Sequence, residues 1–286
     1  MPQTPSPDNP LDQAEVRARH ASNRAAWNEG ALVYTAEINA TVAFIAAGKS
    51  NLHPIERRNL GELRAWCQTA IHLQCASGKD TLSLLNEGVQ RVTGVDISDR
   101  HIDNARQITA ALESMGRPVQ AAWIRCDVLD TPHILDGTAD LVYTGRGALC
   151  WIHDLHAYAQ VVARLLKPGG VYHVLDDHPI TGLFDLEPET YVFRGVSYFR
   201  DWEASVGWPS TYIGDALNIP VEKQSTKYER GWNLMEIFNA LSSAGLIVEY
   251  LGEHPEPYWN VFPNIRPELR GIIPLTFSML ARKKAG

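Results

Sequence analysis

Hydrophobic positions along the middle of the chain follow an alternating pattern. Between residues 70 and 175, short runs of aliphatic residues alternate with longer amphipathic segments. This alternation is typical of βαβ units built around a parallel sheet. The strands are expected at 70–75, 91–96, 121–126, 139–144 and 170–175, and the helices between them at 79–87, 100–115 and 154–166.

The flanking regions follow other patterns. Residues 13–48 show the apolar spacing of a helix, and a polar, proline-containing stretch follows. LKPGG at 166–170 predicts a helix end, a turn and then the next strand. Residues 176–230 are rich in aromatics and poor in periodicity, as expected of a lid or an added subdomain. The last elements are expected to be a helix at 232–244 and strands at 246–251 and 272–281.

These elements together predict an α/β fold. We expect a Rossmann-like, mostly parallel seven-stranded sheet with helices on both faces, a helical N-terminal cap and a lid insertion after the fifth strand. The expected divisions are a disordered tail at 1–12, the helical cap at 13–68, a cofactor-binding core at 69–175, a substrate lid at 176–230, and a C-terminal helix with the last strands of the core at 231–286.

Composition narrows the possible partners. The net charge is −7, and an acidic surface does not neutralise phosphates, so we expect no nucleic-acid partner. No apolar run approaches the roughly 20 residues that span a bilayer, and the polar, proline-rich start lacks the apolar core of a secretion signal. The four cysteines form no CxxC pair. Reduced thiols in a cytoplasmic protein without a metal site are the expectation.

One segment carries the signature of a cofactor site. Residues 70–98, AIHLQCASGKDTLSLLNEGVQRVTGVDIS, predict a strand, a tight turn at Gly78, a helix and a second strand that ends in Asp96. A carboxylate about 20 residues past such a turn is placed to bind two ribose hydroxyls. Gly78 taken alone is equally compatible with a plain turn. The combination indicates a nucleotide-type cofactor.

The same segment resembles motif I and its acidic partner in class I S-adenosylmethionine (SAM)-dependent methyltransferases. It is especially similar to a bacterial subgroup that reads HLQC..G.DTLSL...G...TGVD.S. The resemblance implies SAM as the cofactor and covers residues 70–175 most specifically. Of the broad family's glycine-rich DxGxGxG pattern only Gly78 is present. The first two glycines of the dinucleotide pattern GxGxxG are missing too, which disfavours NAD.

The resemblance also implies a set of cofactor contacts. An acid after the third strand, Asp127, would accept a hydrogen bond from the adenine amino group while Val128 packs on the ring; the alternative is that Asp127 caps a turn. Arg146 would pair with the cofactor carboxylate or with a structural acid. The remaining implied contacts are Gln74, Cys75, Ala76, Ser77 and Gly78 in the turn, Asp96 and Ile97, Thr144 and Gly145, and Tyr34, which with Trp27 resembles a helical cap over SAM.

Candidates for acid–base chemistry are histidines. His178 follows the fifth strand and could act as a general base, since histidine titrates near neutrality; it could equally brace the turn before Pro179. His153 is the second candidate, although a histidine beside an N-cap such as Asp154 is more often structural. His254 is the third. A base is needed only if the acceptor carries a proton at working pH.

The acceptor would lie among aromatic side chains. Such side chains suit a planar or cationic ligand, although many of them could form the core of the lid itself. The candidate substrate contacts are Trp151, His178, Tyr198, Trp208, Tyr212 and Trp259, with Tyr191, Phe193, Phe199 and Trp202 as further lid aromatics.

These observations predict a SAM-dependent methyltransferase that methylates an O, N or C nucleophile of a small organic molecule by in-line displacement. A SAM-binding protein without transferase activity is the first alternative, and an NAD-dependent oxidoreductase is the second. A nucleic-acid methyltransferase is disfavoured because TGRG stands where (N/D)PP(Y/F) is usual. The oligomeric state is left open.

Overall fold

A seven-stranded sheet forms the centre of the molecule. The computed structural model describes residues 11–199 and 203–285. The strand order is β3-β2-β1-β4-β5-β9-β8. The first five strands of this order are parallel, and β9 runs antiparallel to both β5 and β8. The strands are β1 Thr69–Leu73, β2 Arg91–Asp96, β3 Ala121–Arg125, β4 Ala139–Thr144, β5 Leu166–Asp177, β8 Leu246–His254 and β9 Thr276–Lys283.

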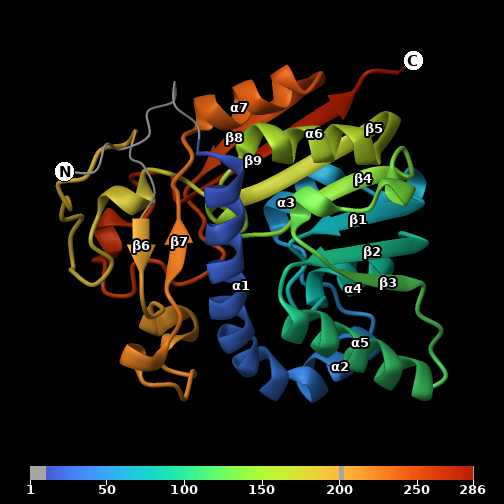
Figure 1. Cartoon of the computed structure of the whole chain (residues 1–286), viewed down its shortest axis with the longest axis horizontal. Helices are drawn as coiled ribbons and strands as arrows, with labels where there is room; N and C mark the ends of the chain where they lie inside the picture. The colour runs from blue at the N-terminus through green and yellow to red at the C-terminus, as the bar shows by residue number, and fades with distance from the viewer. Residues whose placement is uncertain (1–10, 200–202, 286) are drawn as a thin grey trace.

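Helices cover both faces of the sheet, as predicted (Figure 1). Alternate side chains of a strand point to opposite faces, so Ile71 and Leu73 pack toward α6 and α7 while Ala70 packs toward α3 and α4. A third apolar cluster joins α2, α4 and α5. The helices are α2 Ile38–Ala46, α3 Pro54–Leu60, α4 Lys79–Asn86, α5 Asp99–Ser114, α6 Leu155–Leu165 and α7 Leu234–Ser243.

The N-terminal region forms a helical cap across the carboxyl ends of the strands. Helix α1, Gln13–Ala36, lies along this edge in Figure 1 and ends where Glu37 separates it from α2. The single helix expected at 13–48 is therefore two. Helix α3 was not expected; a capping box between His53 and Glu56, followed by Pro54, starts it within the segment that reads as polar loop.

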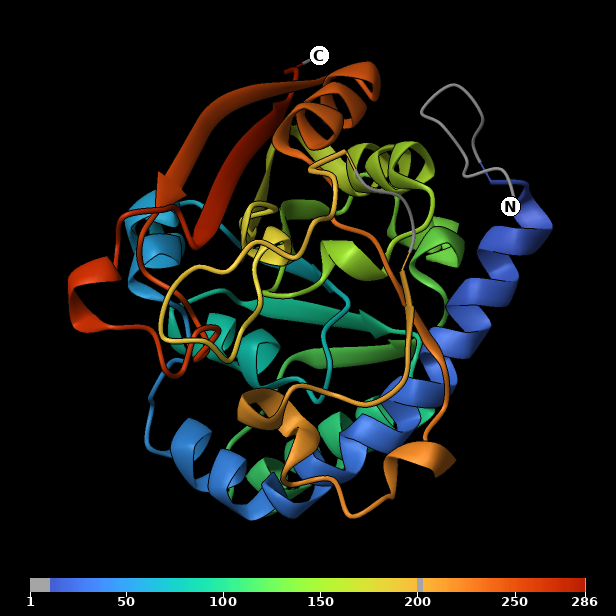
Figure 2. The same ribbon diagram turned by 90° about the vertical axis from the view of Figure 1, so that its left-hand side faces the viewer.

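The lid begins at His178, because β5 extends to Asp177. It contains a two-stranded antiparallel sheet of β6 Glu203–Ser205 and β7 Lys227–Glu229, and a π-helical turn at Ser210–Gly214. Figure 2 shows the lid and α1 crossing in front of the strand ends. The first part of the lid packs against the loop after β8, where Phe184 and Tyr191 meet Phe262. Trp202 and most of the expected tail at 1–12 lie outside the described residues.

Two strands start four residues away from their predicted positions. LKPGG does not form a turn between α6 and a strand, because β5 starts at Leu166 immediately after α6. The left-handed backbone of Gly169 (φ +80°) lies within a bulge, where the pairing with β4 shifts between Ala139 and Leu141. The last strand starts at Thr276, four residues later than expected, after an irregular segment that includes the short turn Pro267–Leu269.

Candidate functional site

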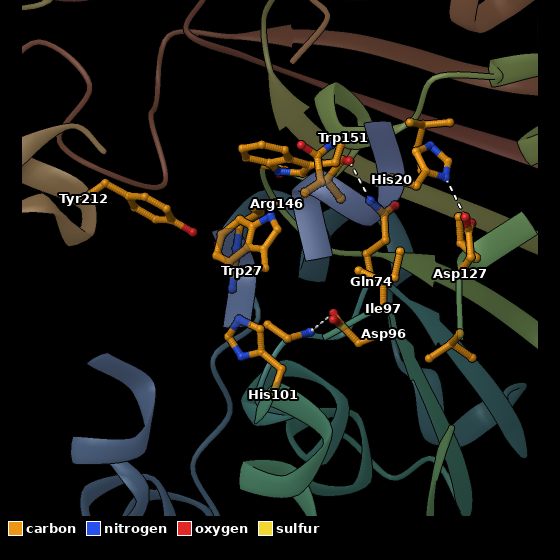
Figure 3. Close-up of a pocket in the computed structure, with 17 residues that line it drawn as sticks. His20, Trp27, Gln74, Asp96, Ile97, His101, Asp127, Arg146, Trp151 and Tyr212 are labelled. Carbon is orange, nitrogen blue, oxygen red and sulfur yellow. Dashed lines mark hydrogen bonds and ion pairs between the residues drawn. The ribbon is translucent and has the colours of Figure 1, made fainter. Parts of the chain in front are cut away.

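An inner cavity lies where β1, β2, β3 and β4 end, covered by α1 (Figure 3). Parallel strands meet at this edge, which is where α/β proteins bind ligands. Seven of the implied cofactor contacts line it: Gln74, Ala76, Asp96, Ile97, Asp127, Val128 and Arg146. Helix α1 contributes His20, Asn23 and Trp27, and the lid contributes Tyr212.

The turn after β1 has an unusual backbone. Gln74 and Ala76 adopt positive φ angles of 58° and 45°, and Gly78 follows at 82°. Positive φ is uncommon in residues with a Cβ, and such strain tends to gather at functional sites. The left-handed residues alternate along HLQCASG, so the turn curls against the end of β2. Two features require glycine at position 78. Its φ is positive, and a Cβ there would lie 2.4 Å from the Trp123 ring.

Asp96 fastens this turn to the end of β2. One carboxylate oxygen accepts from Ala76 N–H (2.8 Å) and the other from Ser98 N–H (2.8 Å). Burial raises the pKa of Asp96 to about 6, although the backbone N–H groups of Ser98, Ala76 and Ile97 oppose the shift. The carboxylate lines the inner cavity with lone pairs left for a ligand hydroxyl.

Two buried polar atoms on the cavity wall have no hydrogen-bond partner among the described residues. Gln74 donates its amide to the carbonyl of Ala148 (2.7 Å), while its Oε1 has no partner. His101 bonds Ser77 through Nδ1 (2.8 Å), while its Nε2 has none. Burial lowers the pKa of His101 to about 3, so the ring is neutral. Buried polar atoms usually have partners, and a polar cofactor would supply them here. These two polar atoms therefore fit a polar, SAM-like molecule in the inner cavity.

Asp127 lies at the far end of the cavity from Tyr212 (Figure 3). It accepts from Leu129 N–H (2.9 Å), as the turn-capping alternative expects, but it also lines the cavity. His20 Nε2 accepts from His153 N–H, so its proton is on Nδ1, which donates to Asp127 (2.7 Å). The pKa of Asp127 is below its usual value. Burial acts to raise this pKa, but the interactions with His20, Leu129 N–H and Arg17 lower it by more.

Arg146 is held by structural acids. It bonds Asp80 (2.7 Å) and Glu56 (3.1 Å), and Glu56 also accepts from Tyr143 (2.6 Å). Of the two alternatives for Arg146, the structure shows this one, with the side chain at the cavity margin. The cluster ties α3 and the start of α4 to the loop after β4.

Six implied cofactor contacts do not line the inner cavity. Thr144 bonds Tyr158 (2.5 Å), and a Cβ on Gly145 would meet the His72 ring. The Tyr34 hydroxyl lies 3.2 Å from that of Tyr212. Cys75, Ser77 and Gly78 complete this group; they form the underside of the turn.

An outer cavity of about 370 Å³ opens beside the inner one. Its walls come from the ends of β4 and β5, the lid and the loop after β8. Four residues line both cavities: Trp27, Gly147, Trp151 and Tyr212. Five of the six expected substrate contacts line the outer cavity: Trp151, His178, Trp208, Tyr212 and Trp259. Tyr198 lies outside it and meets Phe199 edge to face.

The histidine candidates have structural partners. His178 accepts from Ile180 N–H through Nδ1 (3.1 Å), so Nε2 carries the proton and donates to Glu253 (2.7 Å). Burial lowers the pKa of His178, in part opposed by Glu253. Both ring nitrogens are therefore engaged, and His178 braces its turn. His153 contacts Asn23 (3.3 Å) and lines neither cavity; burial lowers the pKa of His153 to about 3.

His254 also lines neither cavity; its Nε2 bonds Ser278 (2.8 Å).

A group that was not expected from the sequence lies on the wall of the outer cavity. Asp177, the last residue of β5, accepts from the Tyr258 hydroxyl (2.6 Å) and the Trp259 indole (3.0 Å). Burial and the neighbouring charge of Asp176 raise the pKa of Asp177 to about 7. The only sequence signal was its place at a strand end.

Asp176 itself supports the loop after β4. Its carboxylate accepts from the N–H groups of Gly147 (2.8 Å), Ala148 (3.1 Å) and Leu149 (2.8 Å). Gly147 thereby becomes part of the shared wall of the two cavities.

Within the described residues, no cluster of three or more metal-binding side chains occurs, and no described helix has the length and apolarity to cross a membrane.

Comparison with known proteins identifies a matched domain and a shared fold. Residues 70–170 match the profile of a family described as a methyltransferase domain. No curated protein sequence matches the chain. The fold is that of solved SAM-dependent methyltransferases, including one from Mesorhizobium loti (22% identity over 80% of this chain and 96% of that chain, TM-score 0.55) and one from Methanosarcina mazei (19%, 82% and 99%, TM-score 0.52).

A third similar structure is geranyl diphosphate C-methyltransferase from Streptomyces coelicolor, solved with Mg²⁺, geranyl-S-thiolodiphosphate and S-adenosyl-L-homocysteine (17% identity over 81% of this chain and 77% of that chain, TM-score 0.51). Residues 70–170 thus match a methyltransferase domain, and the chain has the Rossmann-like fold of solved SAM-dependent methyltransferases.

Proposed function

We propose that the protein is a SAM-dependent methyltransferase and that it methylates a small organic acceptor bound in the outer cavity. The observation that carries this proposal is the wall shared by the two cavities. Trp27, Gly147, Trp151 and Tyr212 line both, so a cofactor in the inner cavity and an acceptor in the outer one would meet there. In-line transfer needs such contact between two oriented reactants.

The inner cavity offers a polar contact at each end for the cofactor. Asp96 would accept from the ribose hydroxyls, and Asp127 with Val128 would hold the adenine. Gln74 Oε1 and the Ala76 backbone would face the methionine portion. When bound, SAM supplies an electrophilic methyl group. The residues of this chain orient the two reactants and exclude water from between them.

The lid and the loop after β8 would select the acceptor. Together they supply Trp208, Tyr212, Tyr258 and Trp259 to the outer cavity, whereas most of the inner wall comes from α1 and residues 74–152. Walls that combine apolar and aromatic side chains with placed polar groups are typical of small-molecule sites. Acceptor choice and cofactor binding are thus assigned to different parts of the chain.

Asp96→Asn tests the cofactor site. Loss of a charged acceptor opposite the ribose costs about 1.5–3 kcal/mol, so S-adenosylhomocysteine should bind roughly tenfold to a hundredfold more weakly by titration calorimetry. Asp99→Asn is the matched control. Asp99 lies three residues further on, bonds Arg24 and Asn28, and does not line the inner cavity. Equal affinity in wild type and Asp96→Asn would contradict the ribose assignment.

Transferase activity needs a separate measurement. Incubation with methyl-labelled SAM and a panel of small amines, phenols and carboxylic acids should give a labelled product. Binding of SAM with no transfer to any member of a broad panel would favour the alternative of a SAM-binding protein without activity.

A further inference from the structure

Asp177 presents a carboxylate to the outer cavity. It lies at the carboxyl end of β5 and is partly exposed, whereas Asp176 beside it is buried. Tyr258 and Trp259 donate to its two oxygens at 2.6 Å and 3.0 Å. A carboxylate has about four lone-pair positions, so two donors leave room for a third.

The other charges of this cavity are already matched. Within the described residues, each Lys or Arg that lines the cavity forms an ion pair with a glutamate: Lys227 with Glu229 (3.0 Å), Arg194 with Glu203 (3.0 Å) and Arg230 with Glu236 (2.6 Å). The carboxylate of Asp176 accepts hydrogen bonds from the N–H groups of residues 147–149. No ion pair of the described residues involves Asp177. One unmatched negative charge is therefore left facing the cavity.

Aromatic rings connect this charge to the shared wall. Trp151 lies 5.3 Å from Trp27, which lies 4.7 Å from Trp208, measured between ring centroids. Tyr212 continues the series 6.4 Å from Trp208 and 5.9 Å from Trp259, whose indole bonds Asp177. Aromatic faces attract cations, and the Lys227 ammonium already lies 5.2 Å from the Trp208 centroid.

We infer that the methyl acceptor is a protonatable amine, drawn in as an ammonium by Asp177 and the aromatic wall. This inference rests on the proposed function and specifies its substrate class. A carboxylate acceptor would be repelled by Asp177, and a neutral alcohol would leave the charge unmatched. The aromatic series leads from Asp177 to the shared wall, where the nitrogen must lie for transfer.

Asp177 also takes part in the chemistry. The ammonium passes one proton to the Asp177 carboxylate, which frees the nitrogen lone pair. The nitrogen then bonds the methyl carbon while the carbon–sulfur bond breaks, and the electron pair of that bond stays on sulfur. The product is a methylated ammonium, and the proton on Asp177 returns to solvent. An amine with no proton to lose would skip the first step.

The test compares four probes of similar size on protein loaded with S-adenosylhomocysteine. They are 3-phenylpropylamine, 3-phenylpropan-1-ol, 3-phenylpropanoate and 4-propylphenol. By calorimetry at pH 8, the amine should bind at least tenfold more tightly than the other three. Asp177→Asn should remove that preference without changing alcohol binding. Glu268→Gln loses the same charge on an exposed turn outside both cavities, and the preference should persist.

A pH titration of amine binding gives a second test, with a variant that keeps the Asp177 carboxylate. In the wild type, amine binding should strengthen as pH rises through about 7, because only ionised Asp177 attracts the cation. Tyr258→Phe removes a donor to the ionised form, so the midpoint should move to higher pH. Tyr191→Phe, whose hydroxyl bonds Leu269 away from the cavity, should not move it. The titratable groups facing Asp177 are Asp176 on the same strand, Glu229 and Lys227 on β7, Cys150 after β4, Tyr212 in the lid, and Tyr258.

The outcomes separate the two proposals. Equal affinity for all probes, tighter binding of the phenol or the carboxylate, no binding of any probe, or a preference that survives Asp177→Asn would overturn the amine assignment. Each of these can occur while S-adenosylhomocysteine still binds. Failure of the cofactor site would appear instead as loss of S-adenosylhomocysteine binding in the first titration.

Discussion

At the scale of single residues, the turn after β1 is fixed more by backbone geometry than by side-chain chemistry. Gln74 and Ala76 hold left-handed conformations although each has a Cβ. Asp96 offsets part of that strain by accepting from the Ala76 N–H. The same carboxylate is a candidate ribose ligand, so structure and binding depend on one residue. Replacing Asp96 should therefore affect both.

Gly78→Ala should destabilise the protein strongly. A left-handed residue with a Cβ costs about 1–2 kcal/mol, and overpacking adds about 1–3 kcal/mol. The added carbon would lie 2.4 Å from the Trp123 ring, whose indole is held by Thr109 (2.9 Å). We expect the free energy of unfolding in urea to fall by about 2–5 kcal/mol.

Gly116→Ala separates the two contributions to that loss. Gly116 has φ +78°, but no atom lies within 4 Å of the position that a Cβ would take. Only the conformational cost applies there, so the loss should be about 1–2 kcal/mol. Equal losses for Gly78→Ala and Gly116→Ala would show that Trp123 yields at no cost.

Some candidate residues line the inner cavity as expected, and others do not, for identifiable reasons. Asp96 ends β2 and Asp127 comes shortly after β3, and strand ends meet at one edge. His178 was chosen for the ordinary pKa of histidine, which burial lowers. Asp177 was missed because burial raises its pKa, and because its donors Tyr258 and Trp259 are about 80 residues away in the chain. Such shifts depend on tertiary contacts that a linear pattern does not contain.

At the scale of elements, periodicity predicted the regular parts of the fold. The strands β2 and β4 have the expected bounds because each is a short apolar run between clear turns. The errors fall where a local feature overrides the pattern. LKPGG carries turn residues, yet they form a bulge inside β5. Helix α3 has only seven residues, too few to show an apolar period, and its capping box carries the signal instead.

The lid is attached to α1 by a few polar side chains. Asn23 accepts from Tyr228 N–H (2.7 Å) and donates to its carbonyl (2.9 Å). Ser22 donates to the carbonyl of Thr226, and Glu29 accepts from Ser225 N–H (2.9 Å). Polar side chains of one helix thus pair with the backbone of the segment that leads through β7.

Asn23→Ala should loosen β7 without unfolding the core. Two partly buried backbone groups of Tyr228 would lose their partners, at about 1–3 kcal/mol, so local opening should increase at least about tenfold. Limited digestion with trypsin should cut faster at Lys223, Lys227 or Arg230. Asn28→Ala is the matched control, since Asn28 on the same helix bonds Ser98 instead of the lid. Equal cutting of both variants would contradict this attachment.

At the scale of the whole molecule, the binding region is assembled from segments far apart in the chain. The inner cavity takes residues from α1, from the ends of β1 to β4, and from the lid. Helix α1 lies between the sheet and the lid (Figure 1), bonding Asp127 and Asp99 on one side and Tyr228 on the other. A cofactor that fills the inner cavity would therefore contact three parts of the chain at once.

Cofactor binding should accordingly order the lid as well as the Rossmann-like core. Trp27 and Tyr212 line the inner cavity from α1 and from the π-helical turn, and the Tyr212 hydroxyl lies 3.2 Å from that of Tyr34. Ligand at about 100 times its dissociation constant stabilises the bound state by about 2.7 kcal/mol, and the free energy of local openings that break the site rises by a similar amount.

Saturation with S-adenosylhomocysteine should slow amide exchange in residues 20–34 and 208–214 as well as in 74–97. Strand β8, at the far edge of the sheet, is the internal control, because its residues line neither cavity. Protection confined to 74–97 and 127–152 would show that the lid moves independently of the cofactor, and that its contact with the inner cavity through Tyr212 carries no binding energy.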